Sequence, residues 1–337
     1  MAQRMIVRIP NWLGDAVMAT AALKEFRRNQ EDSITLLGQP NLLQVFSASP
    51  YRYSFLPYDR NREHAGWKGL WEIASRLRKE KFDRGYLLTN SFSSALLFRL
   101  GGVRERVGFR GHFRSGLLTH ALPPLGITRH QAEKYAFLLT GNIPEPLQPE
   151  IFLTEEERSW AKEVLKQHKI TNRTRIGFAF GAAYGSAKRW PPERYAETAR
   201  RCITDLGAKV LLFGGEKEAE AAVGLVEQVG KGCLNFAGQT GLRELFALIE
   251  RCRVLVCNDS GLMHVATALE TPVIALFGPT DPIETGPLGT GNRIVSQDLD
   301  CAPCLKRECP LGHHACMELI QVNTIIEEIA TLLKKNK

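Results

Sequence analysis

The sequence predicts an α/β protein with two doubly wound parallel sheets, one in each half of the chain. Apolar runs that end abruptly in Gly, Pro, Asn or Asp alternate with longer segments of helical periodicity. A length of 337 residues exceeds the usual size of one hydrophobic core, so two domains are expected. The prolines at 144, 146 and 149 place the boundary, which gives domains over 1–150 and 151–337. The last helix either belongs to the second domain or packs back on the first.

The first half opens with a predicted strand, turn and helix. An apolar run at 5–9 predicts the strand, and PNWLG at 10–14 predicts the turn. Apolar residues at helical spacing then predict a helix over 15–28. Further strands are expected at 33–38 and 84–88, with an amphipathic helix over 70–81. Between 99 and 149 the signals weaken, because Gly, Pro and basic residues interrupt the pattern.

In the second half the starts and ends of the predicted strands and helices are clearer. A capping box from Thr154 to Glu157 predicts a helix start. Strands are expected at 175–180, 209–213, 254–257 and 273–277, alternating with helices near 193–206, 218–229, 242–252 and 262–269. This order predicts a parallel sheet with right-handed crossovers, whose ligand groups lie at the carboxyl ends of the strands. The turns there are expected to open toward a cleft between the domains.

Composition describes an ordinary globular protein and excludes a membrane-spanning one. Apolar residues make up 44% and charged residues 24% of the chain. No apolar run approaches the roughly 20 residues that span a bilayer, and the N-terminus lacks the pattern of a secretory signal. A cytoplasmic location is therefore expected.

The net charge of +8 lies entirely in the first half. Residues 1–150 hold 21 Lys and Arg against 13 Asp and Glu, whereas residues 151–337 hold 23 of each. The densest basic run faces only Glu105 as an opposing charge and comprises Arg99, Arg104, Arg106, Arg110 and Arg114. Either this is a solvated face, or it docks an acidic partner: an anionic substrate, an anionic membrane or nucleic acid.

Two charged residues follow predicted strands and are candidates for catalysis. Asp15 opens the first helix, where it is either a carboxylate favoured by the helix dipole or a general base. Lys188 ends a loop of small residues, GAAYGSAK at 181–188. That loop is either flexible and solvated, or it lets the backbone approach a phosphate to which Lys188 adds positive charge.

The run NDSGLMH at 258–264 is the most informative stretch. It follows an apolar run directly, and a helix starting near Ser260 would aim free N–H groups at a phosphate. His264 lies one helical turn from the strand end and is either a ligand contact or a structural group. Glu216, after the strand at 209–213, is either a ribose contact or an ordinary residue of a first helical turn. The sequence has neither the dinucleotide fingerprint nor the Walker loop.

Four cysteines crowd near the end as C-x2-C-x4-C-x6-C: Cys301, Cys304, Cys309 and Cys316. Reduced thiols with a structural role, remote from the chemistry, are the favoured interpretation, because disulfides are uncommon in a reducing compartment. A structural Zn²⁺ at these four thiols and a redox role remain open, and no metal site is favoured.

These stretches together resemble the ADP-heptose:lipopolysaccharide heptosyltransferases of glycosyltransferase family 9. The matching runs are IPNWLGDAVMAT at 9–20, KRWP at 188–191, FGGE at 213–216, NDSGLMH at 258–264 and FGPTDP at 277–282. They span nearly the whole chain in the family's order. The cysteine cluster also looks like a pattern found in many members. One departure is the loop before Lys188, which reads AAY where some relatives have hydroxyl residues.

The resemblance implies a GT-B fold, with two facing Rossmann-like domains and an interdomain cleft. It implies transfer of L-glycero-D-manno-heptose from ADP-heptose to the inner core of lipopolysaccharide, the second heptose being favoured. The transfer inverts the anomeric carbon and requires no metal or other cofactor. Asp15 matches the general base, and Lys188 matches the lysine that stabilises the departing diphosphate. The matched donor contacts are Glu216, Thr240, Asp259, Ser260, Gly261 and His264.

The acceptor implied by the resemblance is a core of the Kdo-lipid A type, met at the inner face of the inner membrane. Its acidic groups would suit the basic run, with Arg104, Arg106 and Arg110 as candidate contacts. A first- or third-heptose transferase, or a transferase using another nucleotide sugar, is the alternative. A nucleic-acid-binding protein is disfavoured, because only Phe109 and Phe113 interleave the basic run.

Overall fold

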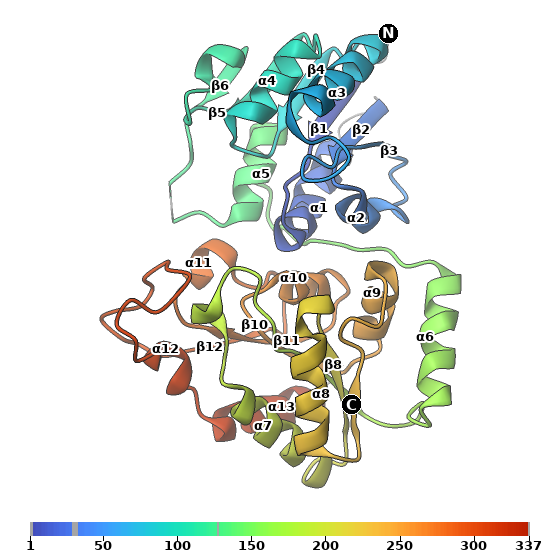
Figure 1. Ribbon diagram of the computed structural model, residues 1–337, viewed down its shortest axis with the longest axis vertical. Coiled ribbons are helices and arrows are strands. Elements are labelled where there is room, and N and C mark those ends of the chain that lie inside the picture. The colour runs from blue at the N-terminus through green and yellow to red at the C-terminus, as the bar shows by residue number, and fades with distance from the viewer. Residues whose placement is uncertain (1–2, 29–32, 127, 336–337) are drawn as a thin grey trace. The chain divides into compact units, whose positions relative to one another are not determined.

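The computed structural model describes residues 3–28, 33–126 and 128–335. The chain divides into two compact units, Met1–Phe152 and Leu153–Lys337, coloured from blue to green and from green to red in Figure 1. The division lies close to the boundary expected from the proline cluster. Each unit contains a six-stranded parallel sheet. None of the described helices is long and apolar enough to cross a membrane.

The first sheet has the strand order β3-β2-β1-β4-β5-β6. Its strands are β1 (Arg4–Arg8), β2 (Ser33–Gly38), β3 (Ser54–Pro57), β4 (Arg84–Leu87), β5 (Glu105–Phe109) and β6 (His120–Leu122). The expected strands at 5–9, 33–38 and 84–88 are confirmed to within one residue at each end. β5 and β6 fall in the region where the sequence signals weaken, because both are short; β5 is flanked by Arg104 and Arg110, and two prolines follow β6.

Helices pack on this sheet and complete the first unit. They are α1 (Leu13–Arg28), α2 (Pro40–Leu43), α3 (Gly66–Glu80), α4 (Phe92–Leu100) and α5 (Gln131–Thr140). α1 is rich in buried alanine, which lets it pack closely along α5, and the two lie side by side in Figure 1. The predicted helices over 15–28 and 70–81 are thus present, each starting earlier than expected.

The second sheet has the order β12-β11-β10-β7-β8-β9. Its strands are β7 (Arg175–Ala179), β8 (Lys209–Phe213), β9 (Cys233–Asn235), β10 (Val254–Asn258), β11 (Val273–Phe277) and β12 (Arg293–Ser296). The four expected strands are confirmed, whereas the short outer strands β9 and β12 carry too few apolar residues to be predicted. Every residue of β10 and β11 is buried, because helices cover both faces of a parallel sheet.

The helices of the second unit are α6 (Glu155–Gln167), α7 (Pro192–Thr204), α8 (Ala219–Val229), α9 (Leu242–Glu250), α10 (Gly261–Ala268), α11 (Pro282–Thr285), α12 (Ala315–Glu318) and α13 (Val322–Lys335). The predicted capping box is confirmed: Thr154 Oγ1 accepts the N–H of Glu157 at 3.3 Å, and the Glu157 carboxylate accepts the N–H of Thr154 at 2.8 Å. Ile325, Ile329 and Leu332 of α13 lie in the core of this second unit.

Candidate active site

All strands of a parallel sheet end at one edge, here called the carboxyl edge. In the second unit the chain runs outward through β7, β8 and β9 on one side and through β10, β11 and β12 on the other. The order therefore reverses between β7 and β10. Ligands of open α/β sheets bind at the carboxyl edge of such a switch point, because the two connections diverge there and leave a crevice.

Lys188 and Asp259 meet at this switch point. The loop after β7 ends in a short 3₁₀ turn, Ser186–Lys188, and the Lys188 ammonium forms an ion pair with Asp259 Oδ2, just after β10. Only 11% of the Lys188 side chain and 6% of the Asp259 side chain are exposed. Thr280, in the turn after β11, donates its hydroxyl to the same carboxylate oxygen at 2.7 Å. Three strand-end turns thus contribute one cation, one anion and one hydroxyl to a single spot.

The side chain of Asn258 holds these turns in place. Its Oδ1 accepts the N–H of Trp190 at 3.2 Å and the hydroxyl of Tyr195 at 3.0 Å, and its Nδ2 donates to Phe180 O at 2.8 Å. This buried amide therefore ties the end of β10 to the end of β7 and to the start of α7. Sequence reasoning included Asn258 in a motif but gave it no role, and it gave none to Thr280. The available signal was their position at or near the end of a buried strand, since Asn258 is the last residue of β10 and Thr280 lies in the turn after β11.

The N-terminus of α10 faces the same edge. Ser260 is its N-cap and has extended backbone (φ −149°, ψ 170°), but its side chain does not cap the helix. The Ser260 Oγ atom is buried and has no hydrogen-bond partner among the described residues. Gly261 follows without a side chain, and His264 is buried one turn further on. A hydroxyl without a partner beside the first N–H groups of a helix suits an anionic oxygen.

The remaining predicted donor contacts lie along the same carboxyl edge. Glu216 is exposed and begins a 3₁₀ turn, Glu216–Glu218, after β8. Thr240 follows β9, and its buried hydroxyl has no hydrogen-bond partner within the described part of the chain. Sequence reasoning missed Glu218, whose carboxylate accepts the N–H of Gly215 at 2.9 Å. A Cβ at Gly181 would lie 2.7 Å from Glu218 Cγ, so glycine there lets the β7 and β8 turns meet.

In the first unit, Asp15 is positioned by a partner from α5. It lies in the first turn of α1, half-buried, and its Oδ1 accepts the hydroxyl of Tyr135 at 2.8 Å. Burial, reinforced by the Asp15 carboxylate, raises the pKa of Tyr135 well above its ordinary value. The phenol therefore stays protonated at neutral pH and orients one oxygen of Asp15. Tyr135 was missed because no local pattern links positions 15 and 135.

A polar cavity of about 280 Å³ lies at the switch point of the first sheet, between the ends of β1 and β4. Its lining is rich in hydroxyl, amide and guanidinium groups: Arg8, Asn11, Gln39, Tyr58, Arg60, Asn61, Thr89, Ser91, Ser93 and Ser94. The buried Arg8 guanidinium donates to Ile9 O at 2.8 Å and to Asn11 Oδ1 at 2.6 Å. Burial lowers the pKa of Arg8 to about 10, which leaves it charged at neutral pH.

Comparison with known proteins places the chain in a family. Residues 70–315 match the family model described as glycosyltransferase family 9 (heptosyltransferase). Lipopolysaccharide heptosyltransferase 2 of Escherichia coli K12 is 33% identical over 352 residues, covering 98% of each chain. The chain belongs to glycosyltransferase family 9.

Solved structures of the family confirm the fold. The structure of the E. coli ADP-heptose lipopolysaccharide heptosyltransferase II matches with a TM-score of 0.84 and 31% identity, covering 99% of both chains. A family 9 glycosyltransferase from Veillonella parvula matches with a TM-score of 0.88 and 26% identity, covering 99% of this chain and 98% of that one. This family 9 chain is thus a glycosyltransferase whose two parallel sheets are those of a GT-B fold.

The basic run of this family 9 enzyme is divided between the two edges of its sheet. Arg104 and Arg106 lie at the start of β5, whereas Arg110 lies just after its carboxyl end. The Arg106 guanidinium donates to the carbonyl oxygens of Leu117 at 2.7 Å and Val103 at 2.6 Å. Arg104 pairs with Asp83 at 3.4 Å. Arg104 and Arg110 are therefore the exposed members of the three predicted acceptor contacts.

The expectation that the cysteine cluster is remote from the chemistry is wrong. The segment carrying it touches the loop that ends in Lys188: Arg307 O accepts the N–H of Ala187 at 3.0 Å, and the His314 ring bonds to Ala187 O at 2.7 Å. This contact could not be predicted from the sequence, because the segment follows the last predicted strand and its His314 is 127 residues from Ala187 of the Lys188 loop. Among the residues that the structure describes, no group of three or more His, Cys, Asp or Glu is arranged to hold a metal.

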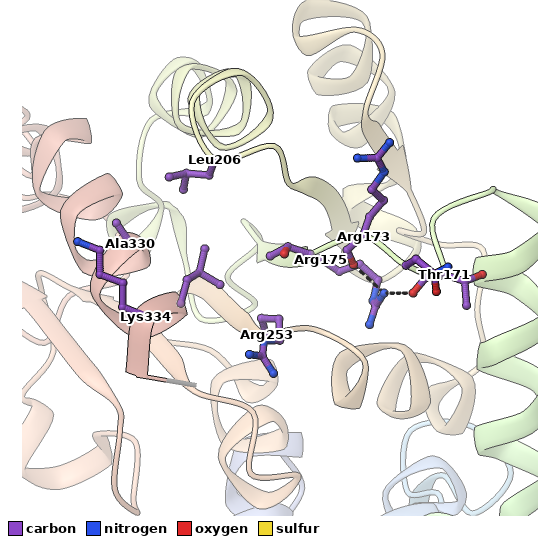
Figure 2. A pocket seen from close by; sticks show the side chains of 10 residues that line it. Thr171, Arg173, Arg175, Leu206, Arg253, Ala330 and Lys334 are labelled. Atoms are coloured by element: carbon purple, nitrogen blue, oxygen red, sulfur yellow. Dashed lines mark hydrogen bonds between the residues drawn. The ribbon is translucent and has the colours of Figure 1, made fainter. Parts of the chain in front are cut away.

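A larger cavity, of about 560 Å³, lies at the opposite edge of the second sheet (Figure 2). Arg175, the first residue of β7, reaches into it and donates to Thr171 O and Arg173 O, both at 2.8 Å. Lys334 and Ala330 of α13 form another part of the wall. Because Arg175 and Arg253 lie at the amino ends of β7 and β10, the cavity is separate from the candidate site at the carboxyl edge.

Proposed function

We propose that this chain is an inverting heptosyltransferase that uses ADP-heptose and acts on the inner core of lipopolysaccharide. Its full-length similarity to heptosyltransferase 2 proteins supports transfer of a heptose, with the second core heptose favoured. The observation that most supports this proposal is the buried Lys188–Asp259 ion pair at the switch point of the second sheet. It lies in the crevice where such sheets bind nucleotides, beside a helix start that suits phosphate.

In this proposal the second unit holds the donor. Lys188, Ser260 and the first N–H groups of α10 would neutralise the diphosphate as it leaves, since negative charge on it grows in the transition state. Asp259 and Thr280 would hold the Lys188 ammonium in place beside the diphosphate. Glu216 would accept hydrogen bonds from the ribose, Thr240 would lie beside the adenine, and Gly261 and His264 would line the diphosphate. Displacement at the anomeric carbon with inversion then needs one base to deprotonate the acceptor hydroxyl, and Asp15 would take that proton.

The test is a transfer assay with purified protein. ADP-heptose and defined acceptors of the Kdo-lipid A type, without heptose or with one heptose, would be incubated and their products weighed by mass spectrometry. Addition of one heptose mainly to the mono-heptosylated acceptor is the expected result. Transfer only to the heptose-free acceptor, or only from another nucleotide sugar, would replace the second-heptose assignment by one of the alternatives.

Turnover is expected to persist in EDTA. Lys188 and the start of α10 already supply positive charge for the diphosphate, so a divalent cation is not needed for that purpose. Initial rates with excess EDTA and with added Mg²⁺ measure this, and rates equal to within about twofold are expected. Loss of turnover in EDTA that Mg²⁺ restores would contradict the proposal.

The acceptor is proposed to bind through the polar cavity of the first unit. Arg60 lines it and donates to Ser93 Oγ at 2.7 Å, so its charge is held at the cavity. Arg60→Ala is expected to raise the acceptor KM about 10-fold, the effect of one lost charge-assisted hydrogen bond, with little change in donor KM. Arg62→Ala is the matched control, since Arg62 is exposed nearby and does not line the cavity.

The basic run is proposed to assist at longer range, at an anionic membrane surface on the inner face of the inner membrane. An Arg104→Ala/Arg110→Ala variant removes the two exposed charges among the three predicted acceptor contacts. Acceptor KM in this variant should rise less than in Arg60→Ala and depend less on salt than in wild type, because exposed charges are screened beyond about 8 Å at physiological ionic strength. The opposite ranking would move the acceptor contact from the cavity to the basic run.

A further inference from the structure

The cysteine-bearing segment, residues 301–314, lies across two turns of the candidate donor site. It follows β12 and precedes α12 in the chain. Leu305 donates its N–H to Pro279 O at 2.7 Å, in the turn that carries Thr280. The same residue accepts the hydroxyl of Tyr184 on its carbonyl oxygen at 2.9 Å, in the loop that carries Lys188. Leu305 therefore connects the turns after β7 and β11.

The segment also binds both backbone groups of the residue before Lys188. The Ala187 N–H donates to Arg307 O at 3.0 Å, and the Ala187 carbonyl oxygen accepts the Nε2–H of His314 at 2.7 Å. The approach is close enough that a Cβ at Gly185 would lie 2.2 Å from Arg307 O. Main-chain contacts thus hold the loop close to the segment. At position 185 this approach leaves room only for glycine.

The ring of Tyr184 contacts both the segment and Lys188. The Lys188 ammonium is 4.7 Å from the ring centroid, and the Arg307 guanidinium carbon is 5.3 Å from it. Both cations are therefore attracted to one ring, which itself bonds to the segment through its hydroxyl. The ring limits where the Lys188 ammonium can lie, apart from its ion pair with Asp259.

Asn258 holds the two ends of the loop and Asp259 pairs with Lys188, but the residues between these anchors have little else to fix them. Residues 181–187 are Gly, Ala, Ser and one Tyr, and glycine loses more backbone freedom on ordering than any other residue. A displacement of about 1 Å in a charge-stabilising group is enough to cost roughly 100-fold in rate. A lysine at the end of such a loop needs an external support to act reproducibly on a diphosphate.

We propose that residues 301–314 position the Lys188 loop for the donor diphosphate, with His314, Tyr184 and Arg307 as the positioning residues. This inference rests on the proposed role of Lys188 at the donor. Cys309 supports His314: its Sγ accepts the His314 N–H at 3.4 Å, and His314 has left-handed backbone (φ 49°) that this bond helps to fix. The Cys309 thiol thus affects the Lys188 loop indirectly, by fixing the backbone of His314.

His314→Phe and Tyr184→Phe each remove one hydrogen bond and keep a ring of similar shape. Each is expected to raise the Kd for ADP about 10-fold and to lower kcat, with the acceptor KM unchanged. In a Lys188→Ala background the same changes should have no further effect on ADP affinity, because the group that they position is gone. Isothermal titration with ADP measures all four combinations for each residue.

Two variants that each remove one positive charge distinguish an effect on the position of the loop from an effect of lost charge. Arg307→Ala and Lys306→Ala each remove one cation from the segment, but only Arg307 stacks on Tyr184. Arg307→Ala is expected to weaken ADP binding about threefold, and Lys306→Ala to leave it unchanged. Equal effects of the two variants would mean that the segment contributes charge and not position.

Hydrogen–deuterium exchange supplies a readout that needs no ligand. Peptides covering 182–190 should exchange faster in His314→Phe than in wild type, because the bonds at Ala187 weaken. Unchanged exchange and unchanged ADP affinity would overturn the inference, and so would additive effects in the Lys188→Ala background. Should His314→Phe fail to fold, Tyr184→Phe decides alone. If wild type did not bind ADP, the proposed function would fail, while exchange would still decide whether the segment holds the loop.

Discussion

Asp15→Asn is expected to lower kcat by about 10²–10⁴-fold while leaving the Kd for ADP nearly unchanged. The amide is the same size as the carboxylate and can still accept the hydroxyl of Tyr135, which is 2.8 Å from Asp15 Oδ1 in the native protein. The geometry is therefore kept, and only the capacity to take a proton from the acceptor hydroxyl is lost. Initial rates at saturating donor and acceptor measure kcat, and titration calorimetry measures ADP binding.

Glu25→Gln is the matched control for this change. Glu25 lies on the same helix and pairs with Arg28 at 3.0 Å, two turns or more from the first turn where Asp15 lies. Its substitution should leave kcat close to wild type. A near-normal kcat in Asp15→Asn would remove the general base from the first unit, and a fall in both variants would point to damage to α1 instead.

Lys188→Ala is expected to lower kcat/KM for the donor by about 10²–10³-fold and to weaken ADP binding as well. In the proposed mechanism the lysine charge acts on the diphosphate in the ground state and more strongly in the transition state, so both quantities should change. The variant also leaves the buried Asp259 carboxylate without its cation, next to where the diphosphate would lie. Steady-state kinetics and ADP titration measure the two effects.

The Asp259 contribution can be separated with a second substitution. Lys188→Ala/Asp259→Asn should bind ADP more tightly than Lys188→Ala, because the repelling carboxylate is gone. Lys217→Ala is the control for charge alone, since Lys217 is an exposed cation on the same carboxyl edge. Unchanged ADP affinity and turnover in Lys188→Ala would reduce the loop to a connector between β7 and α7.

The strands and the strand-end residues of both units could be predicted from sequence, for a physical reason. β10 and β11 are buried on both faces, so they are continuous apolar runs, and the chain must turn polar where each of them ends. Asp259 is a candidate because it directly follows β10, and Asp15 and Lys188 are candidates because they lie in the segments that follow β1 and β7. β5 and β6 were not predicted, because they are short and basic residues or prolines interrupt the apolar pattern beside them.

The contacts that organise the site could not be predicted, because they join positions far apart in the chain. The Tyr135 hydroxyl lies 120 residues from Asp15, and the His314 ring lies 127 residues from Ala187. No periodicity encodes either bond. The cysteine spacing was visible, but spacing alone does not say which surface a segment covers, and it led to the wrong expectation that the cluster is remote.

In the proposed mechanism, the ion pair between Lys188 and Asp259 has a consequence for the release of the product. A lysine without a counter-charge would hold a released nucleoside diphosphate tightly, and departure of the product would then limit turnover. Asp259 offers the lysine an internal anion that is ready to replace the phosphate. As the product leaves, re-formation of this pair offsets the attraction between the lysine and the phosphate. In this mechanism the carboxylate would therefore weaken nucleotide binding and speed the release of the product.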